Sequence, residues 1–215
     1  GPRVLGGVPT LRELSVDDLK KVVEKKAMVI DTRPWAAFKQ GHLPGALHLP
    51  LNNTFNTDAG SLIGEHDVIH LIIEPSRVDE AVRDLIRVGL DKFCGWYDAS
   101  KLDRFEAAGG TLVPTAEVTV SEARVMLDTT KPFVLDARRK AEFIEGHLPG
   151  ATNIAHTRLL SRLAEVPKDR PILVNCRSGA RSARACSLLQ RHGYQVTNLA
   201  GGMLAWEAAK VPVVQ

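Results

Sequence analysis

The stretch Val29–Pro50 reads VIDTRPWAAFKQGHLPGALHLP, and a later stretch, Val134–Ala155, reads VLDARRKAEFIEGHLPGATNIA. The two stretches align at a spacing of 105 residues, which places Asp31 on Asp136 and one GHLPGA element on the other. In both copies a short apolar run, typical of a buried strand, ends on the paired aspartate. A repeat of this length with its elements in the same order indicates that one domain occurs twice in the chain.

Upstream of each copy lies the same signal for the start of a helix. Ser15 with Asp18, and Thr119 with Glu122, have the spacing of a capping box. Apolar residues at helical spacing follow each box. Both copies are therefore expected to begin with an amphipathic helix that leads into the first strand.

Downstream the spacing becomes 104 residues, which aligns Val68–Leu71 with Ile172–Asn175. Strands that alternate with short helices predict the α/β class, as two domains that each contain a mainly parallel sheet flanked by helices. The region that holds Gly109, Gly110 and Pro114 lacks apolar periodicity and is interpreted as a linker. The predicted divisions are residues 1–100, a linker over 101–116, and residues 117–215.

Composition and charge exclude several classes of protein. Of the 215 residues, 44% are hydrophobic and 25% charged, which excludes a disordered or fibrous chain. Without a run of about 18 apolar residues, no membrane span is expected. The net charge of +3 divides into −2 for residues 1–114 and +5 for residues 115–215. This balance argues against nucleic acid as a partner and makes the second copy the better host for an anion.

The three cysteines are too few and too scattered for a disulfide framework, and no CxxC pair suggests zinc. With no signal-peptide pattern at the N-terminus, we expect a cytoplasmic protein that keeps a thiol for chemistry. No metal or organic cofactor is required by the sequence.

The second copy contains a cysteine in a chemically suggestive place. The strand that runs to Asn175 is followed by Cys176-Arg177-Ser178-Gly179-Ala180-Arg181 and then by a helix expected over residues 182–192. Backbone N–H groups of a short glycine-containing turn at a helix N-terminus can converge on one point, and the helix dipole adds positive potential there. Such a site, with two arginines, favours the nucleophilic thiolate. The alternative, a cysteine that only packs in the core, gives no reason for the arginines.

These features together resemble the rhodanese (sulfurtransferase) family: an Asp-x-Arg strand end, a GHLPGA element, and a cysteine that heads a six-residue loop. The resemblance covers nearly the whole chain as two tandem rhodanese-like domains. It implies that Cys176 takes a sulfane sulfur from thiosulfate or a small persulfide and passes it to a thiol or cyanide. Backbone donors from Arg177 to Arg181 would form the cradle, with positive potential from Arg138, Arg177 and Arg181. The related phosphatases and arsenate reductases have a loop one residue longer.

Two further expectations rest on the same resemblance. Some family members that prefer thiosulfate carry a lysine where Ser178 stands, which favours a persulfide or organic thiol donor here. The opening stretch GPRVLGGVPTLRELS, which has no initiator methionine, resembles a segment that joins a metallo-β-lactamase-like domain to rhodanese domains. A longer fusion protein, or a metallo-β-lactamase-like partner, is therefore also expected.

The first copy has no nucleophile. At the 104-residue spacing Ile72 stands where Cys176 stands, and Glu74 and Pro75 would spoil an anion cradle by adding a negative charge and removing one N–H. The first domain is therefore expected to be catalytically silent and to have a structural role.

Other residues have competing interpretations. Arg138 could lie near the substrate or form a salt bridge with Asp136, Glu142 or Glu145, and Asp136 itself is interpreted as structural. Because His42 occurs in the silent copy, a fold-supporting role is favoured over metal binding for both His42 and His147. The remaining candidates are a resolving thiol or core residue (Cys186), a core anchor of the last helix (Trp206), and a cysteine without an assigned role (Cys94).

Three functions remain open at this point. The leading one is a sulfurtransferase with Cys176 as persulfide carrier. The second is a non-catalytic sulfur-relay or protein-binding module attached to a persulfide-processing enzyme. The third, disfavoured by the loop length, is a phosphatase or arsenate reductase.

Overall fold

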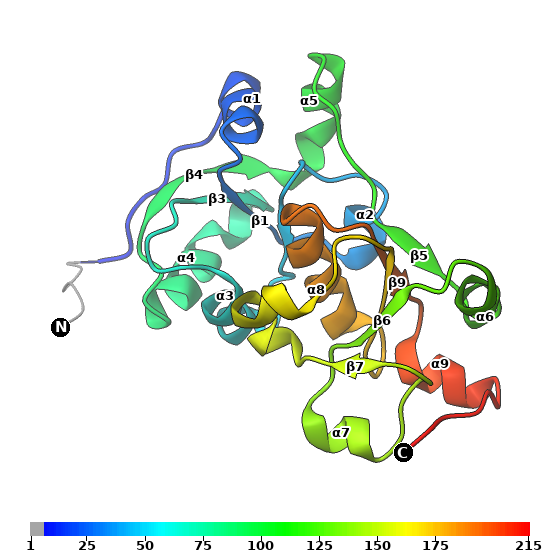
Figure 1. Cartoon of the computed structure of the whole chain (residues 1–215). Helices are drawn as coiled ribbons and strands as arrows, with labels where there is room; N and C mark the ends of the chain where they lie inside the picture. The colour runs from blue at the N-terminus through cyan, green and yellow to red at the C-terminus, as the bar shows by residue number, and fades with distance from the viewer. Residues whose placement is uncertain (1–6) are drawn as a thin grey trace. The chain divides into compact units, whose positions relative to one another are not determined.

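The computed structural model describes residues 7–215 and divides the chain into two compact units, Gly1–Pro114 and Thr115–Gln215. Each unit contains one sheet whose strands are all paired in parallel, flanked by helices (Figure 1). The predicted α/β class and the predicted pair of similar domains are therefore confirmed. In the described part of the chain, no helix is both long enough and apolar enough to cross a bilayer.

The first unit has a four-stranded sheet with the order β2-β1-β3-β4. Helices α1 and α5 lie on one face of this sheet, and α3 and α4 lie on the other (Figure 1). Its elements are α1 (Val16–Glu24), β1 (Met28–Asp31), α2 (Trp35–Phe38), β2 (Leu47–His48), α3 (Phe55–Leu62), β3 (Ile69–Ile73), α4 (Val78–Arg87), β4 (Phe93–Asp98) and α5 (Leu102–Ala107), with 3₁₀ turns at Pro75–Arg77 and Ala99–Lys101.

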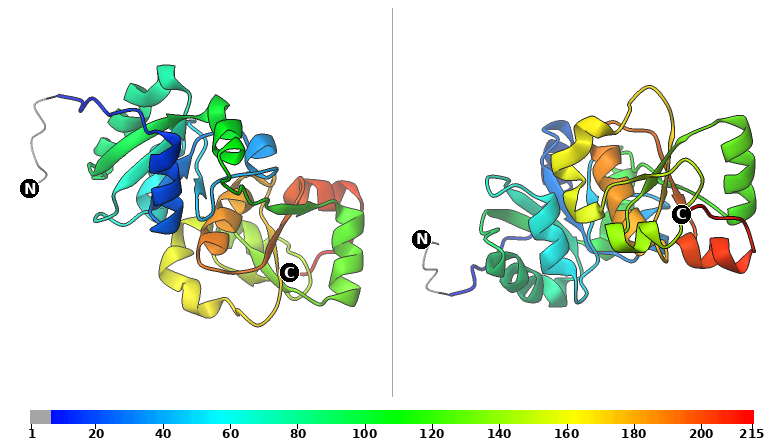
Figure 2. Two further views of the ribbon diagram at one scale, coloured as in Figure 1. Left: turned by 90° about the horizontal axis from the view of Figure 1, so that it is seen from above. Right: turned by 60° about the horizontal axis from the view of Figure 1, so that its bottom comes forward.

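The second unit has a five-stranded sheet with the order β5-β9-β8-β6-β7. Helices α6 and α9 lie side by side over one face, and α8 covers the other (Figures 1 and 2). Its elements are β5 (Ala116–Val118), α6 (Val120–Thr129), β6 (Phe133–Asp136), α7 (Lys140–Ile144), β7 (Thr152–Asn153), β8 (Ile172–Asn175), α8 (Ala180–Arg191), β9 (Val196–Leu199) and α9 (Gly202–Ala208), with 3₁₀ turns at His156–Arg158 and Leu160–Glu165.

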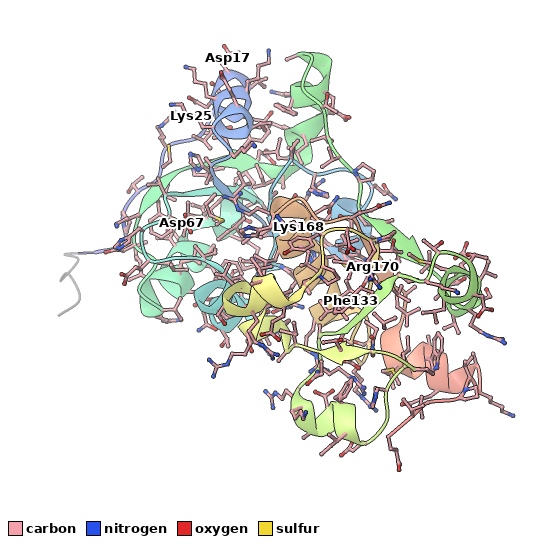
Figure 3. All side chains as sticks on the ribbon, in the orientation of Figure 1. Asp17, Lys25, Asp67, Phe133, Lys168 and Arg170 are labelled. Atoms are coloured by element: carbon pink, nitrogen blue, oxygen red, sulfur yellow. The ribbon has the colours of Figure 1, made fainter. Side chains whose placement is uncertain are left out.

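The two predicted helix starts are present as capping boxes. In α1 the Ser15 hydroxyl accepts from the Asp18 N–H while the Asp18 carboxylate accepts from the Ser15 N–H, and Thr119 and Glu122 do the same in α6. Each box satisfies two N–H groups that the first helical turn would leave without partners. Asp17 and Lys25, near the two ends of α1, point into solvent (Figure 3), which leaves Leu19 and Val22 to face the core.

The expected linker over residues 101–116 is instead folded for much of its length. Leu102 and Phe105 of α5 are buried in the core of the first unit, and Gly110 lies so close to the Phe105 ring that a side chain there would overlap it. The structure divides the chain between Pro114 and Thr115. Helix α5 has too weak an apolar pattern to be predicted, because it is short and its buried residues are Leu102 and Phe105.

The register between the two units also differs from the predicted one. Asp31 pairs with Ile72 across β1 and β3, whereas Asp136 pairs with Asn175 across β6 and β8. Since the aspartates correspond, Ile73 and not Ile72 occupies the position of Cys176. The first copy thus has an isoleucine at this position, as it would at the predicted register.

The opening stretch that suggested a fusion protein lies partly outside the described residues. Residues 1–6 of this stretch are not described by the structure. The metallo-β-lactamase-like domain or partner therefore stays a prediction from the sequence.

Candidate active site

The candidate site lies at the carboxyl end of β8, the central strand of the second sheet. This strand lies between β6 and β9, and the chain passes from β6 to the edge strand β7 on one side and from β8 to β9 on the other. In open parallel sheets, such a reversal of strand order leaves a crevice at the carboxyl ends where ligands bind. Cys176 is the first residue after β8 and begins the loop that leads into α8.

Two donors contact the sulfur of Cys176. The Gly179 N–H lies 3.2 Å from Sγ, and the Ser182 hydroxyl, which has one proton to donate, lies 3.4 Å from Sγ and 3.1 Å from the Gly179 carbonyl oxygen. Both come from the junction where the loop becomes helix α8, and Gly179 has a φ of +95°, a left-handed conformation that glycine adopts without strain. Donors directed at the sulfur from the start of a helix suit a cysteine that takes part in chemistry.

The loop also retains backbone donors for a further anionic group. Within residues 7–215, the N–H groups of Ser178, Ala180 and Arg181 have no protein acceptor. They belong to the loop and the first turn of α8, where the helix supplies no intrahelical partner. Together with the positive end of the helix dipole, such unpartnered donors are chemically suited to an anion.

Helix α9 is hydrogen-bonded to the loop that begins at Cys176. The N–H groups of Met203 and Leu204 in α9 donate to the carbonyls of Cys176 and Arg177, at 2.8 and 3.0 Å. Gly202 makes this approach possible, because a Cβ at that position would overlap the Cys176 carbonyl oxygen. The nearby Trp206 is buried in the core, as predicted, and anchors α9 beneath the loop.

Arg181, expected to supply positive potential, is held by a partner that the sequence did not reveal. Its Nη1 and Nη2 donate to the two carboxylate oxygens of Glu142 in α7, at 2.6 and 2.7 Å. The hydrogen bonds from Arg181 lower the pKa of Glu142 to about 2, and the same pair raises the pKa of Arg181. Both side chains are about one quarter exposed. The positive charge of Arg181 is therefore already balanced by the Glu142 carboxylate before any anion binds.

This ion pair has a measurable pH signature. Because the pKa of Glu142 is about 2 in the folded chain against an ordinary 4.5, the pair stabilises the fold fully above pH 4.5 and loses its effect as pH falls toward 2. Glu142→Gln is expected to lower the free energy of unfolding by about 1 kcal/mol near pH 7. Denaturant titrations at several pH values should show the gap to wild type closing between pH 4.5 and 2. A gap that stays constant with pH would contradict this assignment.

The structure places Arg138 in a structural contact. Its Nε and Nη2 donate to both carboxylate oxygens of Asp136, and Nη2 also donates to the Gly146 carbonyl. The Arg138 side chain is only 4% exposed, and Asp136 is fully buried. Of the two interpretations open from the sequence, this geometry supports the salt bridge. Asp136 also accepts from the Asn175 amide, so the network fixes the strand end that carries Cys176.

The histidines of the two GHLPGA elements make the same contacts in both units. His42 stacks on Phe38 and His147 stacks on Phe143, with ring centroids 3.8 and 3.7 Å apart. Nδ1 of each histidine is hydrogen-bonded to the carbonyl of the phenylalanine four residues earlier. The described residues contain no cluster of potential metal ligands. The fold-supporting interpretation therefore agrees with the structure.

The other cysteines are not placed as catalytic groups. Cys186 lies in α8 and is fully buried, and burial raises its thiol pKa well above the usual value. Such a thiol is a poor nucleophile, which supports core packing over a resolving role. Cys94 is half-buried in β4 of the first unit.

Comparison with known proteins shows two matches to one family. The sequence profile of the rhodanese-like domain matches residues 15–94 and 119–209. A sulfurtransferase from Allochromatium vinosum is 40% identical over 90 residues, which cover 41% of this chain and 84% of that protein. The thiosulfate sulfurtransferase GlpE from Shewanella oneidensis is 30% identical over 93 residues, 43% of this chain and 92% of that protein.

Among solved structures, a rhodanese-like domain protein from Staphylococcus aureus is 29% identical with a TM-score of 0.41, covering 43% of this chain and 91% of that one. A thiosulfate sulfurtransferase from Pseudomonas aeruginosa is 21% identical with a TM-score of 0.44, covering 94% of this chain and 43% of that one.

Proposed function

Because the chain belongs to the rhodanese family, we propose that it is a sulfurtransferase whose second domain carries sulfane sulfur on Cys176. The observation that carries this proposal is the contact of the Gly179 N–H and the Ser182 hydroxyl with the cysteine sulfur. Core cysteines that only pack have no need of two donors. The free N–H groups of the loop support the same reading, since a bound persulfide is an anion at neutral pH.

The reaction proceeds as two sulfur transfers. The Cys176 thiolate attacks the outer sulfur of thiosulfate or of a small persulfide, a bond forms between the two sulfurs, and sulfite or a thiolate leaves with the electron pair. A thiolate or cyanide then attacks the outer sulfur of the Cys176 persulfide, and the cysteine thiolate leaves. No net oxidation or reduction of the protein occurs over the cycle. The loop donors hold the negative charge on sulfur in each state.

Ser178, which takes the position of a lysine in some thiosulfate-using relatives, favours a persulfide donor. The test compares the two donors at equal concentration with cyanide as acceptor, and measures the rate of thiocyanate formation. The proposal expects thiocyanate from both donors, faster from glutathione persulfide than from thiosulfate. Absence of thiocyanate with both would contradict the enzyme, and faster turnover of thiosulfate would contradict the donor preference.

The hydroxyl of Ser182 offers a smaller and independent prediction. Ser182→Ala removes one donor from the sulfur but leaves the backbone donor of Gly179 in place. We expect sulfur loading about threefold slower, because the hydroxyl proton is shared with the Gly179 carbonyl and such a hydrogen bond contributes roughly 0.7 kcal/mol. Single-turnover loading with rapid quench measures it. Ser187→Ala is the matched control, because its hydroxyl bonds a helix carbonyl in the same helix, and it should leave the loading rate unchanged.

One observation favours the second candidate, a non-catalytic sulfur relay or protein-binding module. Cys176 is fully buried, so a small donor reaches its sulfur only after side chains around the loop move. A relay that receives sulfur only from a protein partner would remain unloaded by small donors. Alkylation distinguishes the two candidates: the enzyme requires that iodoacetamide modifies Cys176 faster than Cys94, and that prior loading with sulfur blocks this modification.

A further inference from the structure

The first unit contains a cavity of about 710 Å³ at the carboxyl ends of its strands. Its walls come from the segments that follow β1, β2, β3 and β4, all within this unit. All strands of this sheet run parallel, and in the order β2-β1-β3-β4 the chain adds strands first on one side of β1 and then on the other, so the strand order reverses between β1 and β3 at the edge where the cavity lies. This is the crevice where open parallel sheets bind ligands, and the volume lies within the range of small-molecule sites.

Two groups of the candidate site in the second unit, the Cys176 thiol and the Glu142 carboxylate, have no equivalent in this crevice. Ile73 takes the place of Cys176, and at the 105-residue spacing Ala37 takes the place of Glu142. Both Ile73 and Ala37 line the cavity. The crevice of the first unit therefore has an aliphatic side chain and a methyl group where the second unit has a thiol and a carboxylate.

Two arginines in the cavity wall each have one guanidinium nitrogen without a hydrogen-bond partner among the described residues. Arg33 uses Nε and Nη2 on Asp31 and the Gly41 carbonyl, and Arg77 uses Nε and Nη2 on Glu80 and the Leu51 carbonyl. Among the residues that the structure describes, Nη1 of neither guanidinium has a partner. These contacts fix both side chains in place. Two oriented guanidinium edges beside one cavity are suited to a carboxylate.

The cavity wall also holds one exposed carboxylate that makes no direct ion pair among the described residues. Asp98 is neutralised by Lys101 and accepts two bonds from Ser100. Glu74, in contrast, accepts from the Ser76 hydroxyl and has no direct ion pair within the described part of the chain, with the charge of Arg77 near enough to interact with it. The rest of the wall is largely apolar, with prolines and aliphatic side chains. The site thus presents an anion-binding edge, an unpaired carboxylate and an apolar surface.

We propose that the first unit binds a small zwitterionic amino compound, an α-amino acid or short peptide, in this cavity. The ligand carboxylate contacts Arg33 and Arg77, its ammonium group faces Glu74, and its side chains lie on the apolar wall. This assignment does not depend on the sulfur chemistry of Cys176. It gives the silent domain a binding function in place of a purely structural one.

Calorimetric titration of the whole chain carrying Cys176→Ser tests the assignment without any contribution from sulfur transfer. The probes are the dipeptide Ala-Leu, its N-acetyl form and its C-terminal amide. We expect the free dipeptide to bind, and each blocked form to bind at least about tenfold more weakly, because each loses one charge-assisted contact. No binding of the free dipeptide up to about 10 mM would overturn the proposal.

Two variants identify the residues. Arg77→Met is expected to weaken binding of the free and the N-acetylated dipeptide alike, by about tenfold. Glu74→Gln should weaken only the free dipeptide, since the acetylated form has no ammonium group to lose. The matched control is Arg83→Met, an exposed arginine of α4 outside the cavity, which should change neither affinity. Equal binding of free and acetylated dipeptide, or affinities untouched by both cavity variants, would contradict the zwitterion site.

Discussion

Cys176→Ser is expected to abolish sulfur transfer, by more than about a thousandfold, while the fold stays intact. A serine hydroxyl cannot form a persulfide, and the substitution changes a single atom in a pocket that already holds two donors, the Gly179 N–H and the Ser182 hydroxyl. The measurement is the rate of thiocyanate formation from each donor, together with the urea midpoint of unfolding, which should stay close to the wild-type value.

Two cysteine controls make this result specific. Cys94→Ser alters a half-buried thiol of the first unit and should leave transfer unchanged. Cys186→Ser alters the fully buried thiol of α8 and should lower stability without removing the loading site. Full activity in Cys176→Ser would sink the assignment and make Cys186 the next candidate.

Gly202→Ala is expected to have the second largest effect. The new Cβ would overlap the Cys176 carbonyl oxygen and lie against the Arg177 carbonyl, both backbone atoms that cannot move aside cheaply. The residue also has a φ of +55°, which disfavours any residue with a Cβ. We expect a loss of about 2–4 kcal/mol in the free energy of unfolding, from overlap and backbone strain together.

Activity should fall further than stability alone explains, because the overlap displaces the peptide that carries the nucleophile. Loading should drop by at least about a hundredfold even at temperatures where the variant stays folded. The matched control is Gly193→Ala, at a φ of +81° with nothing within 4 Å of the added Cβ. It tests backbone strain without overlap, and should lower stability by about 1 kcal/mol and leave activity unchanged.

Most of the fold was predictable because its signals are local. The capping boxes at Ser15 and Thr119 lie within four residues of their partners, and the strands before Asp31 and Asp136 are short apolar runs with clear ends. The stacked histidines follow from a repeated motif. Such patterns are determined by neighbouring residues, so a single sequence suffices to find them.

The register of the silent loop was not predictable for a physical reason. The helices that follow it end on Gly89 and Gly193, which keep the 104-residue spacing, while the strands before it differ by 103. The loop in the first unit is therefore one residue shorter than the loop that begins at Cys176. Since Ile72 and Ile73 are identical in type, the apolar pattern gives no sign of where the deletion falls.

The partners of the site residues were hidden because they lie far away along the chain. Glu142 meets Arg181 across 39 residues, and Gly202 meets Cys176 from the next helix but one. A charge pair of this kind could be suspected only from the missing carboxylate at Ala37 in the silent copy. The sequence thus points to Cys176 as the candidate nucleophile, while the groups that surround it become visible only in three dimensions.

The most direct test of the Cys176 persulfide is the mass of the intact chain. The protein is incubated with thiosulfate or, separately, with glutathione persulfide, and then treated with cyanide. We expect a gain of about 32 Da, one sulfur atom, that cyanide removes and that is absent in Cys176→Ser. No gain with either donor, or a gain that persists in Cys176→Ser, would contradict it.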